Sequence, residues 1–153
     1  NEVAVRKIFR IKNREDSKSM LLLLDDKEKL EEYVFIPDIA WDLIRLSNTP
    51  LTIIYPGARN IAPGLIATDG STGIRITNDK FCSQLIKRFG KPIVSTSANL
   101  SGTPSPSDFE EIDEILINSV DYVVKWRQND HLKRRHSSII KLEPDGSFRI
   151  IRK

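Results

Sequence analysis

The chain contains the segment Lys91-Pro-Ile-Val-Ser-Thr-Ser-Ala-Asn-Leu-Ser-Gly-Thr-Pro-Ser-Pro-Ser107, in which a short apolar run meets a cluster of hydroxyl side chains. The run Pro92–Val94 predicts a buried strand. Gly102 and the prolines after it predict a turn and then extended chain. Such strand ends build anion sites in α/β proteins, because small side chains let a phosphate approach the backbone. The alternative is an ordinary serine-rich surface loop.

Outward from this segment, helices and strands are predicted along the whole chain. Ser107 and Glu110 have capping-box spacing and predict a helix over residues 108–118. Asn78 or Asp79 caps a predicted helix that ends at Gly90. Other helices are predicted at 2–12, 26–33 and 37–46, and strands at 20–24, 50–55, 71–77, 121–124, 137–142 and 148–152. Helices alternate with strands early and strands dominate late, which predicts a mixed α/β sheet with helices packed on it.

Length and composition limit the class of protein. The 153 residues fit one domain, and the net charge of +3 permits nucleic-acid contact without requiring it. The single cysteine, Cys82, excludes an internal disulfide, and with only two histidines a structural zinc site is not expected. No apolar run approaches the roughly 18 residues of a membrane helix, and no secretory signal is present. We expect a cytoplasmic protein without a membrane partner, and residues upstream of Asn1, because the chain begins within a predicted helix.

Three groups of cations are candidates for function, each with a plainer alternative. Lys12 and Arg14 follow the first predicted helix, where they either grip phosphate or are solvated helix-end charges. Arg75 lies between isoleucines in a predicted strand and is either a half-buried charge that needs a partner or an arginine on the solvent face. The basic segment 125–136 is either an ordinary loop or a contact for tRNA or triphosphate, and Trp126 beside Arg127 adds a candidate stacking surface.

The string Ser97-Ala98-Asn99-Leu100-Ser101-Gly102, after Pro92–Thr96, resembles the signature of the YrdC-like family, the threonylcarbamoyl-AMP synthases of tRNA modification. Four further elements resemble the family's motifs and follow in its order: Lys12-Asn13-Arg14, Gly73–Ile76, Ser137–Ile140 and Ile150–Arg152. The resemblance covers nearly the whole chain and implies a single YrdC-like domain over residues 1–153. It also implies a twisted mixed α/β sheet around a basic concave cavity.

The resemblance implies a nucleotidyltransferase, an L-threonylcarbamoyladenylate synthase. It would join L-threonine, bicarbonate and ATP, with Mg²⁺, into threonylcarbamoyl-AMP and pyrophosphate, and a separate transferase complex would use the product to modify tRNA. Cationic clamps and aligned donors stabilise the charge of such a reaction without a protein nucleophile. By resemblance, Lys12 and Arg14 are catalytic and no residue is a metal ligand. The implied ATP-binding residues are Lys12, Arg14, Ser71, Ser97, Asn99, Ser105 and Arg152, and the threonine-binding residues are Arg75, Ser95 and Ser138.

The chain departs from the family pattern in places. The family's N-terminal segment, with its Pro-Thr-Asp-Thr and Tyr-Gly-Leu motifs, would precede Asn1, so we expect an incomplete site in the sequence given. Ser138 stands where the family usually has threonine, and the basic segment 125–136 replaces a glycine-rich approach. Two alternatives stay open. One is a module that binds tRNA or double-stranded RNA, and the other is a regulatory nucleotide-binding module, both without synthase activity.

Overall fold

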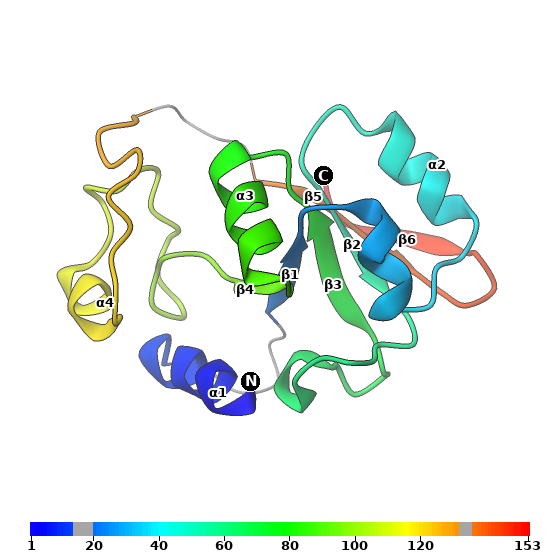
Figure 1. The fold of residues 1–153 in the computed structure, drawn as a ribbon, viewed down its shortest axis with the longest axis horizontal. Coiled ribbons are helices and arrows are strands. Elements are labelled where there is room, and N and C mark those ends of the chain that lie inside the picture. The colour runs from blue at the N-terminus through cyan, green and yellow to red at the C-terminus, as the bar shows by residue number, and fades with distance from the viewer. Residues whose placement is uncertain (14–19, 132–135) are drawn as a thin grey trace.

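The predicted strands pair into one six-stranded sheet (Figure 1). The structure is a computed structural model that describes residues 1–13, 20–131 and 136–153, so that Arg14 lies outside the described residues. Two of its short helices are 3₁₀ helices, named η1 and η2. The elements are α1 (Glu2–Ile11), β1 (Leu21–Leu24), η1 (Lys27–Glu32), α2 (Ile39–Leu46), β2 (Leu51–Tyr55), η2 (Pro63–Leu65), β3 (Thr72–Ile76), α3 (Lys80–Phe89), β4 (Ile93–Ser95), α4 (Glu114–Ser119), β5 (Ser138–Leu142) and β6 (Phe148–Arg152).

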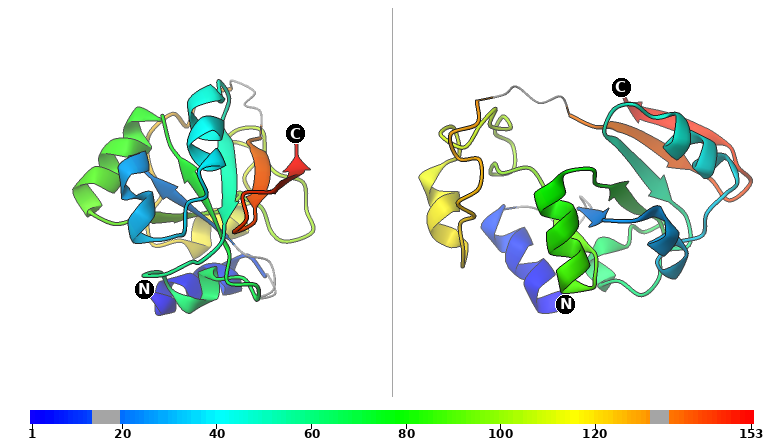
Figure 2. Two further views of the ribbon diagram at one scale, coloured as in Figure 1. Left: turned by 90° about the vertical axis from the view of Figure 1, so that its right-hand side faces the viewer. Right: turned by 45° about the horizontal axis from the view of Figure 1, so that its top comes forward.

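The sheet is mixed, which confirms the predicted fold class. Its strands lie in the order β4-β1-β3-β2-β5-β6. The pairs β1–β3 and β2–β5 are parallel, whereas β1–β4, β2–β3 and β5–β6 are antiparallel. Both views of Figure 2 show α2 and α3 on the same side of the sheet.

The two faces of the sheet differ in chemistry because successive side chains of a strand point to opposite sides. One row is apolar and almost fully buried, with Leu22, Leu24, Ile53, Tyr55, Ile74 and Leu142 each at most 2% exposed. It packs with apolar side chains of α1, η1 and α2. The register places Arg75, Thr52, Lys141 and Ser95 on the opposite face. Strand alternation therefore gathers the polar residues of four strands on one surface, which we call the polar face.

The helix that follows the serine-rich segment begins later than predicted. The helix expected over 108–118 is α4, which starts after Asp113, whose carboxylate accepts the Ile115 N–H at 2.8 Å. The capping box of Ser107 and Glu110 does not form. Instead, the Ser107 N–H donates to Glu111 at 2.7 Å. Asp108 accepts the Glu110 N–H at 3.1 Å, and such a local side-chain bond favours a turn over a helix start.

The strand predicted over 121–124 is also absent from the described fold. These residues belong to no ladder of the sheet, and the ring of Tyr122 is 73% exposed. Asp121 is held to α1 instead, by an ion pair with Lys7 at 2.6 Å. A strand needs a neighbour to pair with, and here the chain passes away from the sheet beside α4 (Figure 1).

The caps predicted for α3 are confirmed. Asp79 accepts the Cys82 N–H at 3.0 Å at its start. Gly90 ends the helix with φ +72°, a left-handed conformation that glycine adopts without strain. The two caps fix where α3 begins and ends, and its start forms one wall of the cavity described below.

Leu142 and Ile150 test the difference between the buried face and the exposed edge of the terminal hairpin. We expect Leu142→Ala to lower the free energy of unfolding by about 2–5 kcal/mol, because the side chain is fully buried at 0% exposure. Ile150, a residue of the edge strand β6, is 53% exposed, and Ile150→Ala should change the free energy of unfolding by less than about 0.5 kcal/mol. Urea denaturation followed by circular dichroism measures both. Equal losses in the two variants would contradict the assignment of the buried face.

Candidate active site

Lys12 is positioned by the end of α1. Its backbone N–H continues the helix to the Ile8 carbonyl at 3.0 Å, and its own carbonyl accepts the Ser101 N–H at 2.9 Å. The residue is only 4% exposed. A lysine held in this way must direct its ammonium group into a polar environment, because a buried charge without partners is very costly.

The turn after β4 supplies that environment. The Lys12 Nζ donates to the carbonyl oxygens of Ser97 and, at 2.5 Å, of Asn99. It also lies 3.4 Å from the Ser97 hydroxyl and 3.3 Å from the Asn99 side-chain oxygen. Lys12 is 85 and 87 positions away from Ser97 and Asn99 in sequence, yet these three residues predicted to bind ATP lie together. We call Lys12, Ser97 and Asn99 the lysine cluster.

The serine-rich turn has a defined internal structure. The Asn99 amide donates to the Thr103 carbonyl at 2.6 Å, and the Thr103 hydroxyl donates to the Leu100 carbonyl at 2.9 Å. Gly102 adopts φ +89° between them. Ser95 lies at the end of β4 opposite Leu21, whereas Ser105 is exposed beyond the turn. A bonded turn of this kind favours a preformed site over an ordinary surface loop.

A second group of cations lies on the polar face. The Arg75 Nε donates to the Thr52 hydroxyl at 3.1 Å and its Nη2 to the Ser137 hydroxyl at 2.8 Å. The Thr52 and Ser137 hydroxyls are 2.9 Å apart. From β6, Arg152 donates to the Ser137 carbonyl at 2.8 and 3.0 Å. We call Arg75, Arg152, Thr52 and Ser137 the arginine cluster.

The arginine cluster carries two positive charges against neutral oxygen atoms. Burial, and then the charge of Arg152, lower the pKa of Arg75. Within the described part of the chain, neither guanidinium makes an ion pair with a carboxylate. Two adjacent guanidinium groups without a carboxylate suit an anionic ligand, and their planar forks match a carboxylate or a phosphate.

Ser137 rather than Ser138 takes part in this cluster. Ser138 pairs with Leu51, so its side chain points to the opposite face from Ile139 and Thr52. The role of Ser138 in threonine binding stays a prediction, and its neighbour is the serine that contacts Arg75. The motif at 137–140 overlaps the strand beside Arg75, but the sequence predicted no role for Thr52 or Ser137. A signal existed in Thr52, a polar residue inside the otherwise apolar run of β2.

Ser71 lies at the other end of β3. It donates to Asp69 at 2.6 Å, and Asp69 forms an ion pair with Lys141 at 2.5 Å. Lys141 and then Ser71 hold the pKa of the Asp69 carboxyl well below its usual range. The four residue steps from Ser71 to Arg75 span about 13 Å of strand. The structure therefore does not bring Ser71 to the arginine cluster, and its role as a nucleotide ligand stays a prediction.

The turn that carries the lysine cluster follows the end of β4, at a distance from Arg75 that suits a substrate. Ser95, next to the lysine cluster, is level with Gly73, two strands away. Arg75 lies two residues further along β3, which puts the backbones of Ser95 and Arg75 about 12 Å apart. Gly73 has no side chain, whereas Leu21 and Leu23 of β1 lie between the two positions and point to the same face. A ligand with two anionic ends, or two ligands side by side, can engage both clusters.

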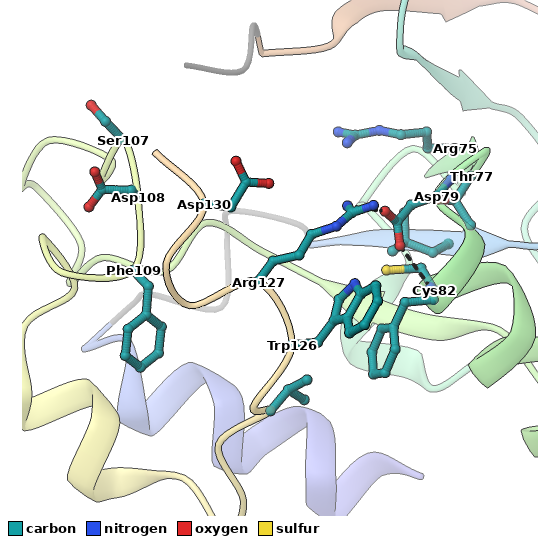
Figure 3. Close-up of a pocket in the computed structure, with 13 residues that line it drawn as sticks. Arg75, Thr77, Asp79, Cys82, Ser107, Asp108, Phe109, Trp126, Arg127 and Asp130 are labelled. Carbon is teal, nitrogen blue, oxygen red and sulfur yellow. Dashed lines mark hydrogen bonds and ion pairs between the residues drawn. The ribbon is translucent and has the colours of Figure 1, made fainter. Parts of the chain in front are cut away.

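A cavity of about 470 Å³ adjoins Arg75 (Figure 3). Leu23 and Thr77 line it from the sheet, and Trp126 and Arg127 line it from the segment after α4. Cys82 is half-buried in its wall, and burial raises the pKa of the thiol, which disfavours the thiolate that a nucleophile requires.

The described residues do not form a metal site. Among them, no three His, Cys, Asp or Glu side chains are grouped so that they could hold an ion. The polar face offers cations and hydroxyls, whereas Mg²⁺ prefers carboxylate and phosphate oxygens. In the same described ranges, no helix is both long and apolar enough to cross a bilayer.

The chain matches one family of known proteins over its whole length. The family model Sua5_yciO_yrdC, described as "Telomere recombination", matches residues 1–153. A Methanocaldococcus jannaschii protein with a provisional threonylcarbamoyl-AMP synthase name is 38% identical over 146 residues, which is 95% of this chain and 67% of that protein.

Two crystal structures share the fold. Escherichia coli YciO superposes with a TM-score of 0.82 at 27% identity, covering 99% of this chain and 73% of that chain. P. abyssi Sua5 in complex with L-threonine superposes with a TM-score of 0.78 at 26% identity, covering 93% of this chain. The chain spans only 42% of that Sua5 chain. The match over all 153 residues shows that the chain belongs to the Sua5/YciO/YrdC family.

Proposed function

We propose that this chain carries the nucleotidyltransferase site of an L-threonylcarbamoyladenylate synthase. It would use L-threonine, bicarbonate and ATP and release threonylcarbamoyl-AMP and pyrophosphate. The observation that supports this most directly is the arginine cluster, in which two guanidinium groups meet at Ser137 among neutral oxygens. The family includes a Sua5 that binds L-threonine, an amino acid whose carboxylate such a fork can hold.

In this proposal the two clusters divide the substrates. Arg75 binds the threonine carboxylate, and Arg152 and the lysine cluster bind the phosphates of ATP. Because Arg75 and Arg152 both contact Ser137, the threonine and the α-phosphate would lie next to each other. That proximity is what the bond between carbamate and phosphorus requires.

The chemistry needs no protein nucleophile. The threonine nitrogen forms a bond to the carbon of bicarbonate, with loss of water, to give a carbamate. A carbamate oxygen then bonds to the α-phosphorus of ATP while the bond to the bridging oxygen of pyrophosphate breaks. The negative charge of the departing pyrophosphate is stabilised by Lys12 and by donors of the turn after β4. By its place in the family motif, Arg14 would be a further cation that binds these phosphates. Mg²⁺ would arrive bound to the triphosphate, and no step is assigned to it.

Further parts of the proposal rest on the family alone. The product would pass to a transferase complex that modifies tRNA, in the cytoplasm. Binding of ATP or RNA without synthesis is the alternative, and product analysis separates the two. Because the chain spans less than half of the P. abyssi Sua5 chain, the assay should compare it with the longest available form of the protein.

Lys12 tests the lysine cluster. We expect Lys12→Ala to lower the rate of threonylcarbamoyl-AMP formation at least about 100-fold, since it removes a cation that stabilises phosphate charge. Mass spectrometry detects the product from ATP, Mg²⁺, bicarbonate and L-threonine. Lys27→Ala, on the exposed surface of η1, is the matched control and should keep its rate. A full rate in Lys12→Ala with an unchanged circular dichroism spectrum would rule out this role.

Arg75 tests the division of substrates. We expect Arg75→Ala to weaken threonine binding by about 10- to 100-fold, the range for a charged hydrogen bond, with a much smaller effect on ATP. Isothermal titration with each substrate alone gives both affinities. Arg45→Ala, an exposed arginine of α2, serves as the control. Equal losses for threonine and ATP would indicate a structural arginine instead.

A further inference from the structure

The cavity beside Arg75 has a wall that the proposed chemistry leaves unused. The rings of Phe81 and Trp126 are stacked, with centroids 6.2 Å apart and planes inclined by 15°. The Arg127 guanidinium carbon lies 5.7 Å from the centroid of the Trp126 ring. These three side chains form a wall in which the two rings are stacked and the guanidinium lies over Trp126, and the residue Trp126 is 57% exposed. Proteins bind nucleobases by stacking them on such aromatic rings and guanidinium planes.

The wall is held in place from the side of α3. The Arg127 Nη1 forms an ion pair with Asp79 at 2.6 Å, and the other oxygen of Asp79 caps α3 (Figure 3). The Cys82 N–H and Arg127 lower the pKa of Asp79, so the carboxylate stays charged at neutral pH. Arg127 has φ +57°, a conformation that is uncommon outside glycine and persists only when surrounding contacts fix it. The wall is therefore formed before any ligand binds.

The opposite side of the cavity offers hydrogen-bond acceptors. Ser107 and Asp108 line it. The Asp108 carboxylate lies 3.1 Å from the His131 Nδ1, and this contact anchors the far end of the segment that carries Trp126. Oxygen atoms of this kind are the partners that an exocyclic amino group of a base requires. The cavity shares Arg75 with the arginine cluster, so a ligand in the cavity lies next to the proposed site of bond formation.

We propose that this cavity binds the base of the nucleotide substrate, which stacks on Arg127 and Trp126 while its phosphates extend toward Arg152 and Lys12. The identity of that nucleotide as ATP rests on the proposed function. The side chain of threonine is small and not planar, so it would leave the wall uncovered. Base stacking also explains why an exposed tryptophan lies in this basic segment, whose positive charges alone do not require an aromatic residue.

The fluorescence of Trp126 can report whether the cavity is occupied. The chain has two tryptophans, and the other, Trp41 of α2, packs against the hydrophobic core. In Trp41→Phe, the emission of Trp126 is observed alone. We expect adenosine and AMP to quench this emission by stacking, and pyrophosphate and L-threonine to leave it nearly unchanged.

The affinity of the base provides a second measurement. We expect Trp126→Ala to weaken AMP binding about 5- to 150-fold, the range for loss of one base–aromatic stack. The affinity for pyrophosphate should not change, and Trp126→Phe should restore most of the AMP affinity. Tyr122→Ala is the matched control, because Tyr122 is an exposed aromatic residue of the same segment that does not line the cavity.

The outcomes separate this inference from the proposed function. Quenching by adenosine without formation of threonylcarbamoyl-AMP would keep the base site and reject the synthase. Product formation with unchanged AMP affinity in Trp126→Ala would keep the synthase and overturn the base site. Quenching by threonine alone would assign the cavity to the amino acid and would also overturn the inference, as would a chain that binds neither adenosine nor AMP.

Discussion

Strand alternation determines which polar residues of this protein can meet. Each central strand buries one row of side chains, and a shift of one residue would expose the apolar row to water. With that row fixed by Leu22, Ile74 and Leu142, the register directs Arg75 and Thr52 to the opposite face. The same constraint separates Ser137 from Ser138, although they are adjacent in sequence. The composition of the site thus follows from the packing of the core behind it.

The arginine cluster shows how the fold keeps like charges together. Two guanidinium groups around one serine repel each other, and burial of Arg75 adds a desolvation cost. Hydroxyl and carbonyl oxygens of Thr52 and Ser137 satisfy some of their donors without neutralising either charge. A carboxylate from the protein would stabilise the cluster further but would occupy the place of an anionic ligand. In the lysine cluster, the carbonyl oxygens of Ser97 and Asn99 accept hydrogen bonds from the Lys12 ammonium group.

Sequence patterns predicted the mixed sheet and the caps of α3, because apolar periodicity and local capping depend on residues near in sequence. The grouping of Lys12 with Ser97 and Asn99 agrees with motifs that periodicity alone could not connect. Two predicted elements did not form, one because local hydrogen bonds favoured a turn and the other because no strand of the described fold lay beside it. Asp108 and Glu111 bonded the turn that was expected to begin a helix, and residues 121–124 had no strand beside them. The contact of Arg75 with Ser137 requires the pairing of strands far apart in sequence, which no single pattern contains.

Helix α1 links the two regions that the proposals connect. Near its middle, Lys7 holds Asp121 at the start of the segment that carries Trp126, and at its end Lys12 enters the turn after β4. The two lysines are five residues apart, which is about 7.5 Å along the helix. A rotation of about 100° per residue turns them to different sides, so one short helix can contact both regions at once. The exposed ion pair between Lys7 and Asp121 adds little stability by itself, but it holds the start of this segment beside α1. A single helix therefore contacts both the segment that carries Trp126 and the turn that surrounds the Lys12 ammonium.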